Sequence, residues 1–228
     1  MIADNSRPVV ALDVDGVIRV IPRLERDRYG MPIGYREPVN TDIAEVTVLE
    51  GGELDTLFHH LEAGSFPVYL ARGAGAWIRS LLDRGIDVVW ATTWMEHANV
   101  HIAPLLGIPE LPVAVKLSEG LPVFRGDSAR WKLFQLARSF PGRPLVWVDD
   151  NPPWDGRTAA LAHERVALGD DGVSLMVTPD VYTGLTQTHM DEIDAWLKLV
   201  STPEGRAQIR AEREREVRGP QQTEAPPG

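Results

Sequence analysis

Three short apolar runs, rich in β-branched residues, constrain the fold of this chain more than any other feature. They are Val-Val-Ala-Leu at residues 9–12, Val-Val-Trp-Ala at 88–91 and Leu-Val-Trp-Val at 145–148. A short run that is apolar at every position is typical of a strand buried on both faces of a parallel sheet. Each run ends abruptly in polar residues. The sequence therefore predicts a buried parallel sheet whose strands all end at a polar edge.

Amphipathic helices are predicted between these strands. Residues 76–84 and 131–137 each place apolar side chains on one helical face, and each is followed by a stop signal, Gly85 or Pro141-Gly142. A further helix, strand and helix are expected at residues 157–164, Ser174–Val177 and 190–199. Strands that alternate with helices predict an α/β fold with a doubly wound, Rossmann-like and mostly parallel sheet.

The first two strands are separated by a segment rich in proline and glycine, at about residues 19–71. It contains β-like runs at 45–49 and 66–71, so we expect a small insertion in the sheet domain rather than a separate domain. Residues 1–200 would then form one domain. Over residues 201–228 the apolar periodicity stops and charges alternate, which predicts a frayed helix and a disordered tail.

Composition excludes several classes of function. The chain has no cysteine, so thiolate metal sites and cysteine nucleophiles are ruled out, and any metal must be held by oxygen or imidazole. The net charge of -10 disfavours broad binding to nucleic acid, whose backbone is held mainly by lysine and arginine. No stretch approaches the roughly 20 apolar residues that span a bilayer, and residues 1–7 do not resemble a signal peptide. We therefore expect a cytoplasmic protein without membrane association.

Reactive side chains follow each of the three main strands. They are Asp13 and Asp15 after the first strand, Thr92 and Thr93 after the second, and Asp149 and Asp150 after the third. In open α/β sheets, ligands bind beyond the carboxyl ends of the strands. A single aspartate after a strand is commonly a turn residue, but three such endings in chain order predict a site. Clustered carboxylates favour Mg²⁺, which prefers oxygen ligands.

These segments resemble the motifs of the haloacid dehalogenase (HAD) superfamily. Leu12-Asp13-Val14-Asp15-Gly16-Val17 resembles the first motif, Ala91-Thr92-Thr93-Trp94 the second, Lys132 the third and Val148-Asp149-Asp150 the fourth. The resemblance spans roughly residues 8–155. The sequence around residues 90–94 and 147–150 is also similar to the HAD domain of multi-domain "Swiss army knife" RNA-repair proteins. An aspartate at position 15 implies a phosphatase rather than a dehalogenase or an ATP-driven pump.

The resemblance implies a catalytic role for four residues. Asp13 would attack phosphorus and form an aspartyl phosphate. Asp15 would protonate the leaving oxygen and then take a proton from the attacking water. Thr92 would donate its hydroxyl to a phosphoryl oxygen, and Lys132 would neutralise the remaining phosphoryl charge.

The resemblance also implies a set of metal ligands. The carboxylates expected to hold Mg²⁺ are those of Asp13, Asp15, Asp149 and Asp150. Of the last two, Asp150 would meet the metal and Asp149 would orient Lys132, although the two assignments are hard to separate. Lys116 is a rival for the role of Lys132, but its strand-like setting suits the role less well.

Three residues near the strand ends are expected to contact substrate: Gly16, Thr93 and Trp94. Gly16 would let the backbone turn tightly, and Thr93 has helix capping as a competing interpretation. Trp94, like Trp154, lies just beyond a strand end and could stack on a nucleobase. The strand tryptophans at positions 90 and 147 are expected to be in the core.

The sequence thus predicts a Mg²⁺-dependent phosphomonoester hydrolase that acts on a nucleotide, a polynucleotide end or another small phosphorylated metabolite. The alternatives are a phosphate-recognising binding module with little turnover and a phosphotransferase that passes the aspartyl phosphate to an alcohol. No obligate protein partner is expected.

The arginines of the insertion have two interpretations. Their guanidinium groups suit a second phosphate or a polynucleotide backbone, or they pair with neighbouring acids on a solvated surface. These arginines are Arg19, Arg23, Arg26, Arg28 and Arg36.

Overall fold

Four parallel strands form the central sheet in a computed structural model, which describes residues 7–48, 64–116, 128–151, 158–170 and 172–218. In spatial order the strands are β7 (Asp87–Trp90), β1 (Val9–Leu12), β8 (Leu145–Val148) and β9 (Ser174–Val177). Every residue of β1 and β8 is buried. Two of the predicted apolar runs therefore form the middle strands of the sheet, and the third forms its edge strand β7, displaced by one residue from the expected position.

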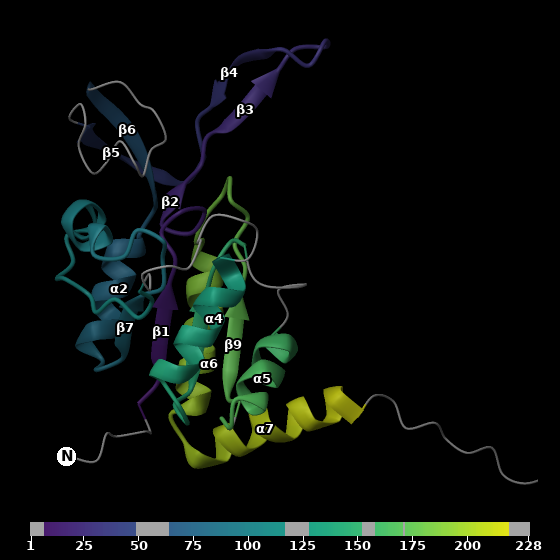
Figure 1. Cartoon of the computed structure of the whole chain (residues 1–228). Coiled ribbons are helices and arrows are strands. Elements are labelled where there is room, and N and C mark those ends of the chain that lie inside the picture. The colour runs from purple at the N-terminus through teal and green to yellow at the C-terminus, as the bar shows by residue number, and fades with distance from the viewer. Residues whose placement is uncertain (1–6, 49–63, 117–127, 152–157, 171, 219–228) are drawn as a thin grey trace, which may run out of the picture.

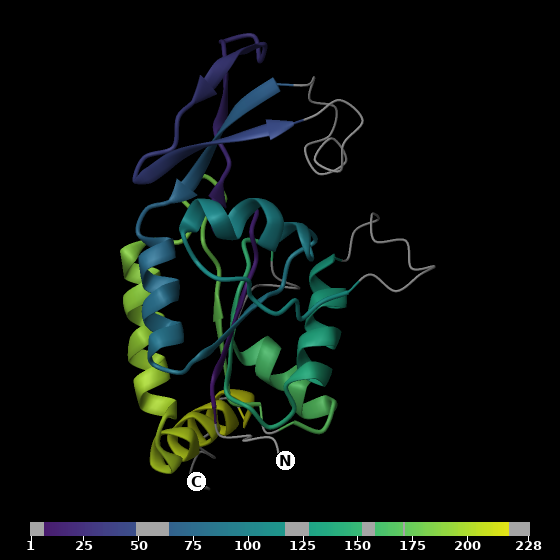
Figure 2. The same cartoon turned by 90° about the vertical axis from the view of Figure 1, so that its left-hand side faces the viewer.

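Helices cover both faces of this sheet (Figure 2). One face carries α2 (Ala74–Asp83) and α6 (Gln187–Val200), and the other carries α4 (Ser128–Ser139) and α5 (Thr158–Ala167). Alternate residues of β1 point to opposite faces, so that Val10 packs in one apolar cluster and Val9 in the other. The result is a Rossmann-like α/β arrangement, as the alternation of strands and helices predicted.

The chain between β1 and α2 forms two small antiparallel sheets beside the carboxyl ends of the parallel strands (Figure 1). The first sheet has the order β2-β6-β5 and the second is a hairpin of β3 and β4. Their bounds are β2 (Arg19–Val20), β3 (Arg23–Arg26), β4 (Pro32–Arg36), β5 (Thr41–Val48) and β6 (Gly64–Ala71). The β-like runs expected in the insertion correspond to β5 and β6, whereas the β3–β4 hairpin was not predicted.

The β3–β4 hairpin projects away from the sheet domain (Figures 1 and 2). All five residues of β4 are exposed. Much of the large apolar surface that the described residues expose lies on or next to this hairpin, at Tyr29, Met31, Ile33 and Tyr35. The insertion therefore divides into a base, which contributes Val20 to the core, and an exposed arm.

Two short helical turns follow β7. They are η1 (Ala98–Ile102), which has π-helical hydrogen bonding, and α3 (Ala103–Leu106). The chain then returns along the open edge of β7, where the backbone N–H of Trp90 donates to the carbonyl of Pro112 at 2.9 Å. This returning segment therefore lies along β7, close to the strand end that carries Thr92 and Thr93.

The C-terminal segment contains a helix in the region where the sequence predicts a frayed helix before a disordered tail. Residues Pro203–Arg218 form a helix, α7, that packs against α6 and α5 (Figure 1). Its apolar periodicity is weak, but Ile209 reaches the core and the Arg206 guanidinium donates to the carbonyl of Val200 at 2.7 Å. These tertiary contacts stabilise a helix whose own apolar pattern is weak. The rest of the expected tail, residues 219–228, lies outside the described residues.

Among the described residues, no helix has the length and apolar character needed to cross a membrane.

Candidate active site

The ends of β1, β7 and β8 lie side by side, because the three strands are parallel and in register. The backbone N–H of Asp13 donates to the carbonyl of Val148 at 3.0 Å, and that of Ala91 donates to the carbonyl of Leu12 at 2.8 Å. The three polar strand ends predicted from the sequence therefore meet at one edge of the sheet, which is where open α/β sheets bind ligands.

Lys132 joins two of these ends. Its ammonium group donates to Asp13 Oδ2 at 2.5 Å and to Asp149 Oδ2 at 2.7 Å. The predicted contact between Lys132 and Asp149 is therefore present. All three side chains are buried, with exposed fractions of 5%, 8% and 1% for Lys132, Asp13 and Asp149. Lys132 reaches this position from the second turn of α4, more than a hundred residues after Asp13.

The second oxygen of each carboxylate is held by the backbone. Asp13 Oδ1 accepts the N–H of Val14 at 2.7 Å, and Asp149 Oδ1 accepts the N–H of Asn151 at 3.0 Å. Both oxygens of each carboxylate therefore accept a hydrogen bond, which fixes the orientation of the carboxylate before any ligand binds.

A third carboxylate completes the group. Asp13, Asp149 and Asp150 each offer an oxygen, and these oxygens lie within 4.8 Å of one another. Gly16 makes room for Asp150, because a Cβ atom added at Gly16 would lie 2.3 Å from Asp150 Cγ. Its φ of +68° is also a conformation that other residues rarely adopt. Gly16 is thus required by the approach of a carboxylate as well as by the turn.

The charges of this group do not balance. Burial lowers the pKa of Lys132, but the charges of Asp13 and Asp149 and their hydrogen bonds outweigh burial and hold that pKa above its usual range. Burial and the charge of Asp13 raise the pKa of Asp149, despite the opposing effect of Lys132. The same two causes raise the pKa of Asp150 to about 6. Three carboxylates lie close together beside one ammonium group, which leaves excess negative charge.

This donor set fits a hard divalent cation. Mg²⁺ is usually held in proteins by one or two carboxylates and keeps several waters, and Asp13, Asp149 and Asp150 supply oxygen ligands only. A bound cation would also cancel the excess negative charge that raises the pKa values of Asp149 and Asp150. The chemistry of the residues therefore agrees with the predicted cofactor.

Asp15 is not a member of this carboxylate group, contrary to the expectation that its side chain is a metal ligand. Its Oδ1 accepts from Arg19 Nε at 2.6 Å, and its Oδ2 accepts from Trp94 Nε1 at 2.9 Å. The turn after Gly16 directs Asp15 toward the insertion, because Arg19 forms a backbone bridge back to Asp15. The Asp15 side chain is 39% exposed and so remains accessible to a ligand.

The segment after β7 corrects two further expectations. Trp94 is 1% exposed, so its ring is not available to stack on a substrate. Thr93 does not cap the following helix, because η1 begins only at Ala98. Thr92 is buried at the end of β7, where its Oγ1 accepts the backbone N–H of Trp94 at 3.2 Å. The hydroxyl proton of Thr92 remains a donor, as the predicted phosphoryl contact requires.

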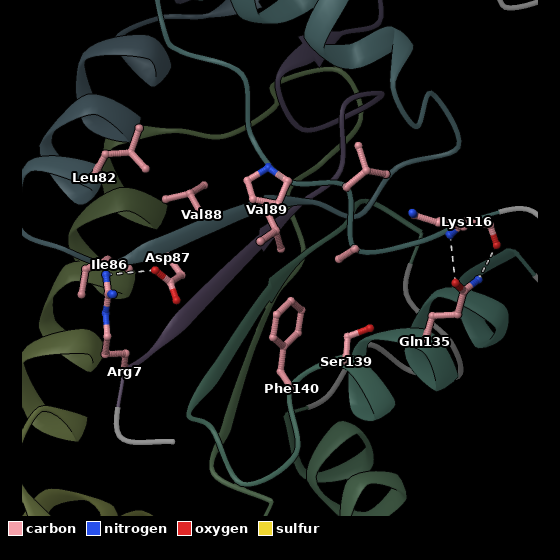
Figure 3. Close-up of a pocket in the computed structure, with 13 residues that line it drawn as sticks. Arg7, Leu82, Ile86, Asp87, Val88, Val89, Lys116, Gln135, Ser139 and Phe140 are labelled. Carbon is pink, nitrogen blue, oxygen red and sulfur yellow. Dashed lines mark hydrogen bonds and ion pairs between the residues drawn. The ribbon is translucent and has the colours of Figure 1, made fainter. Parts of the chain in front are cut away.

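A pocket of about 630 Å³ lies elsewhere, and none of its lining residues belongs to the carboxylate group. Figure 3 shows the side chains that line it. Lys116 lines this pocket, where its backbone forms two hydrogen bonds of 2.9 Å with the side chain of Gln135. Lys116 is therefore not the lysine of the strand-end site. At the other end of the pocket Arg7 pairs with Asp87 at 3.0 Å.

Sequence reasoning missed the contacts of Arg19 and Trp94 with Asp15. The separation of four residues between Asp15 and Arg19 was a usable signal, whereas the contact with Trp94 spans 79 residues. Trp154, a second candidate for substrate stacking, lies outside the described residues.

Comparisons with protein-family models, with curated proteins and with solved structures found no match to this chain. The functional argument therefore rests on the residues and their geometry.

Proposed function

We propose that this protein is an HAD-type phosphatase that hydrolyses phosphomonoesters with Mg²⁺ and forms an aspartyl phosphate on Asp13. The observation that carries the proposal is the buried bridge of Lys132 between Asp13 and Asp149, next to Asp150 and at the carboxyl edge of parallel strands. A phosphate monoester is an anion, so its attack by a carboxylate requires nearby positive charge. The site holds one buried cation and the ligands for a second.

In the first step, an oxygen of Asp13 forms a bond to phosphorus while the bond from phosphorus to the ester oxygen breaks. Asp15 transfers a proton to the departing ester oxygen. Lys132 and the hydroxyl of Thr92 bind the phosphoryl oxygens, on which negative charge is concentrated. Asp13 is suited to this attack because its two present hydrogen bonds fix the direction of its carboxylate.

In the second step, water attacks phosphorus and the bond between phosphorus and Asp13 breaks. Asp15 takes a proton from this water, and inorganic phosphate leaves. Mg²⁺, held by Asp13 and by Asp149, Asp150 or both, would supply further neutralisation of phosphoryl charge. Asp149 also orients Lys132, through the 2.7 Å contact between them.

The substrate is proposed at the level of class: a nucleotide, a polynucleotide end or a small phosphorylated metabolite. The insertion begins at Arg19, four residues after Asp15, so its side chains lie where the leaving group of a phosphate ester would extend. Chemistry would therefore come from the strand ends and selection from the insertion. The cytoplasmic location and the lack of an obligate protein partner stay predictions from the sequence.

A substrate panel tests the proposal. Nucleotides, 5′- and 3′-phosphorylated oligonucleotides and small phosphorylated metabolites are incubated with the protein, with and without Mg²⁺. We expect phosphate release from at least one class, dependent on Mg²⁺. Release from none, with retained binding of phosphorylated ligands, would instead support a binding module. Transfer of the phosphoryl group to added glycerol would support a phosphotransferase.

A further inference from the structure

The carboxylate of Asp15 is held at both oxygens by side chains that differ in burial. Trp94 donates its indole N–H to Oδ2 at 2.9 Å, and Arg19 donates Nε–H to Oδ1 at 2.6 Å. The Arg19 guanidinium also lies 5.7 Å from the centre of the Trp94 ring. Trp94 is 1% exposed, whereas the side chain of Arg19 is 20% exposed. Trp94 is therefore the more deeply buried member of the pair, and close packing restricts its ring.

The chain places this indole by a tight turn at the end of β7. Thr92 Oγ1 accepts the backbone N–H of Trp94, and the carbonyl of Thr92 accepts that of Met95, both at 3.2 Å. Met95 adopts a φ of +47°, which a residue with a side chain rarely does. The turn directs the ring back into the core, where Trp94 belongs to the same apolar cluster as Leu12 and Val14. Its N–H is then aimed at a carboxylate that is itself partly exposed.

A fixed donor matters because an aspartate side chain is otherwise free to rotate. Its terminal torsion has a broad energy well, and proton transfer requires an approach of about 2.6–3.2 Å between the heavy atoms. A long arginine side chain can follow the carboxylate as it moves, whereas an indole packed in the core cannot. Of the two side-chain contacts of Asp15 given above, the one with Trp94 therefore ties its carboxylate to the buried core of the sheet domain.

We propose that Trp94 is a positioning residue, whose indole N–H holds Asp15 where it can protonate the leaving group. This inference rests on the proposed phosphatase function for the role of Asp15. The contact itself does not depend on that function, and the two can be tested separately.

The chain offers matched controls for the test. Trp90, Trp94 and Trp147 are all at most 1% exposed, but their indole N–H groups differ in their hydrogen-bond partners. That of Trp90 donates to Asn99 Oδ1 at 2.8 Å, and that of Trp147 has no partner among the described residues. Replacement of each by phenylalanine removes a buried N–H and keeps an aromatic ring. Only Trp94→Phe removes one that contacts Asp15.

The contact is tested by the indole N–H resonances of ¹⁵N-tryptophan-labelled protein, with each peak assigned from its Trp→Phe variant. We expect Asp15→Asn to shift the Trp94 peak more than any other, because the acceptor changes from a carboxylate to a neutral amide. The peaks of Trp90 and Trp147 should stay in place. An unmoved Trp94 peak would overturn the inference. This test leaves Trp94 intact and needs no turnover.

The role is tested by kinetics on benzyl phosphate, which has an alkyl leaving group, and on 4-nitrophenyl phosphate, which has a good one. Trp94→Phe should lower kcat about ten- to hundredfold for benzyl phosphate, because a displaced catalytic group loses about that much. The loss on 4-nitrophenyl phosphate should be severalfold smaller, since its leaving group needs less protonation. KM should change little, and the Trp90→Phe and Trp147→Phe variants should show no such difference between substrates.

A double-mutant cycle completes the test. In the Asp15→Asn background, Trp94→Phe should cause almost no further loss, because the group that it positions is gone. Equal losses on both substrates, or losses that add in the double variant, would show that Trp94 acts only through stability and would overturn its positioning role. Absence of phosphate release from every substrate would overturn the proposed function, while the indole shift would still decide the contact.

Discussion

The sheet domain and the inserted hairpin handle charge in opposite ways. In the sheet domain, Lys132 is 5% exposed and is shared by two buried carboxylates. In the hairpin, the Arg36 side chain is 69% exposed and pairs with Glu25 at 2.6 Å on the surface. A buried pair fixes geometry and is costly to break, whereas an exposed pair is screened by water. The two regions therefore differ in how much each charge contributes.

The same contrast holds for the backbone. The polar strand ends are positioned by a parallel register that involves most of the core. The hairpin is held largely by its own turn, in which Asp27 Oδ1 accepts the N–H groups of Tyr29 and Met31 at 2.8 and 2.9 Å. A locally stabilised arm can change without moving the site. Under the proposed function, the sheet would determine whether a phosphate ester is hydrolysed, and the arm would be free to determine which one.

The largest effect is expected for Asp13→Asn. The change removes the nucleophilic charge, so turnover should fall by about a thousandfold or more. The fold should remain, because asparagine has nearly the same shape and because one of three crowded negative charges is lost. Phosphate release and circular dichroism, measured on the same sample, check both statements. Near-normal release from a folded variant would remove Asp13 from the role of nucleophile.

Removal of the metal should have the next largest effect. Exhaustive chelation should lower activity about a hundredfold or more, and added Mg²⁺ should restore it. Ca²⁺ should compete for the site and support little turnover, since it tolerates looser geometry than Mg²⁺. Mg²⁺ should also raise Tm in wild type and raise it less in Asp150→Asn. Full activity after chelation would contradict the proposed mechanism.

The contrast between buried and exposed charge predicts a difference in stability. Lys132→Met leaves Asp13 and Asp149 without their shared cation, so the free energy of unfolding should fall by about 3 kcal/mol. The matched change Arg36→Ala, which breaks the exposed pair with Glu25, should cost at most about 1 kcal/mol. Urea denaturation without Mg²⁺ measures both. Similar losses in the two variants would remove the distinction between the regions.

The sequence predicted the sheet well because its strands are buried on both faces. β1, β8 and β9 have the expected bounds, and β7 is displaced by one residue. A strand in the centre of a parallel sheet must be apolar at every position, so its pattern is unambiguous. The predicted proximity of the polar ends then followed from parallel register alone.

The features that the sequence did not predict depend on weak local patterns or on contacts between distant parts of the chain. The β3–β4 hairpin shows no simple alternation of apolar and polar residues. For α7 the sequence predicted a helix, but not the contacts of Arg206 and Ile209 with other parts of the chain that stabilise it. The position of Trp94 just beyond a strand end suggested exposure. The tight turn after Thr92 instead returns its ring to the core, and no local pattern reports that turn.

The smallest expected effect concerns three arginines of the arm: Arg23, Arg26 and Arg28. Among the described residues they form no ion pair; Arg23 lies over the ring of Tyr182, Arg28 over that of Tyr29, and Arg26 donates to the carbonyl of Gly30. Their guanidinium groups therefore keep N–H donors for a second phosphate or a polynucleotide backbone. The alternative of pairing with nearby acids describes Arg36 and not these three.

Replacement of all three by alanine should raise KM for the true substrate about five- to tenfold, because contacts made equally in the ground and transition states are lost. Hydrolysis of 4-nitrophenyl phosphate should be unchanged, since this small ester reaches only the strand ends. Replacement by lysine is the matched control, because it keeps the charge and removes the planar fork. If charge alone matters, lysine restores KM; if the planar guanidinium group matters, lysine does not restore it.

For an oligonucleotide substrate, the alanine variant should also show a weaker dependence of binding on salt concentration, because fewer counterions are released on binding. Loss of both activities, or of neither, would mean that the arm plays no part in choosing the substrate.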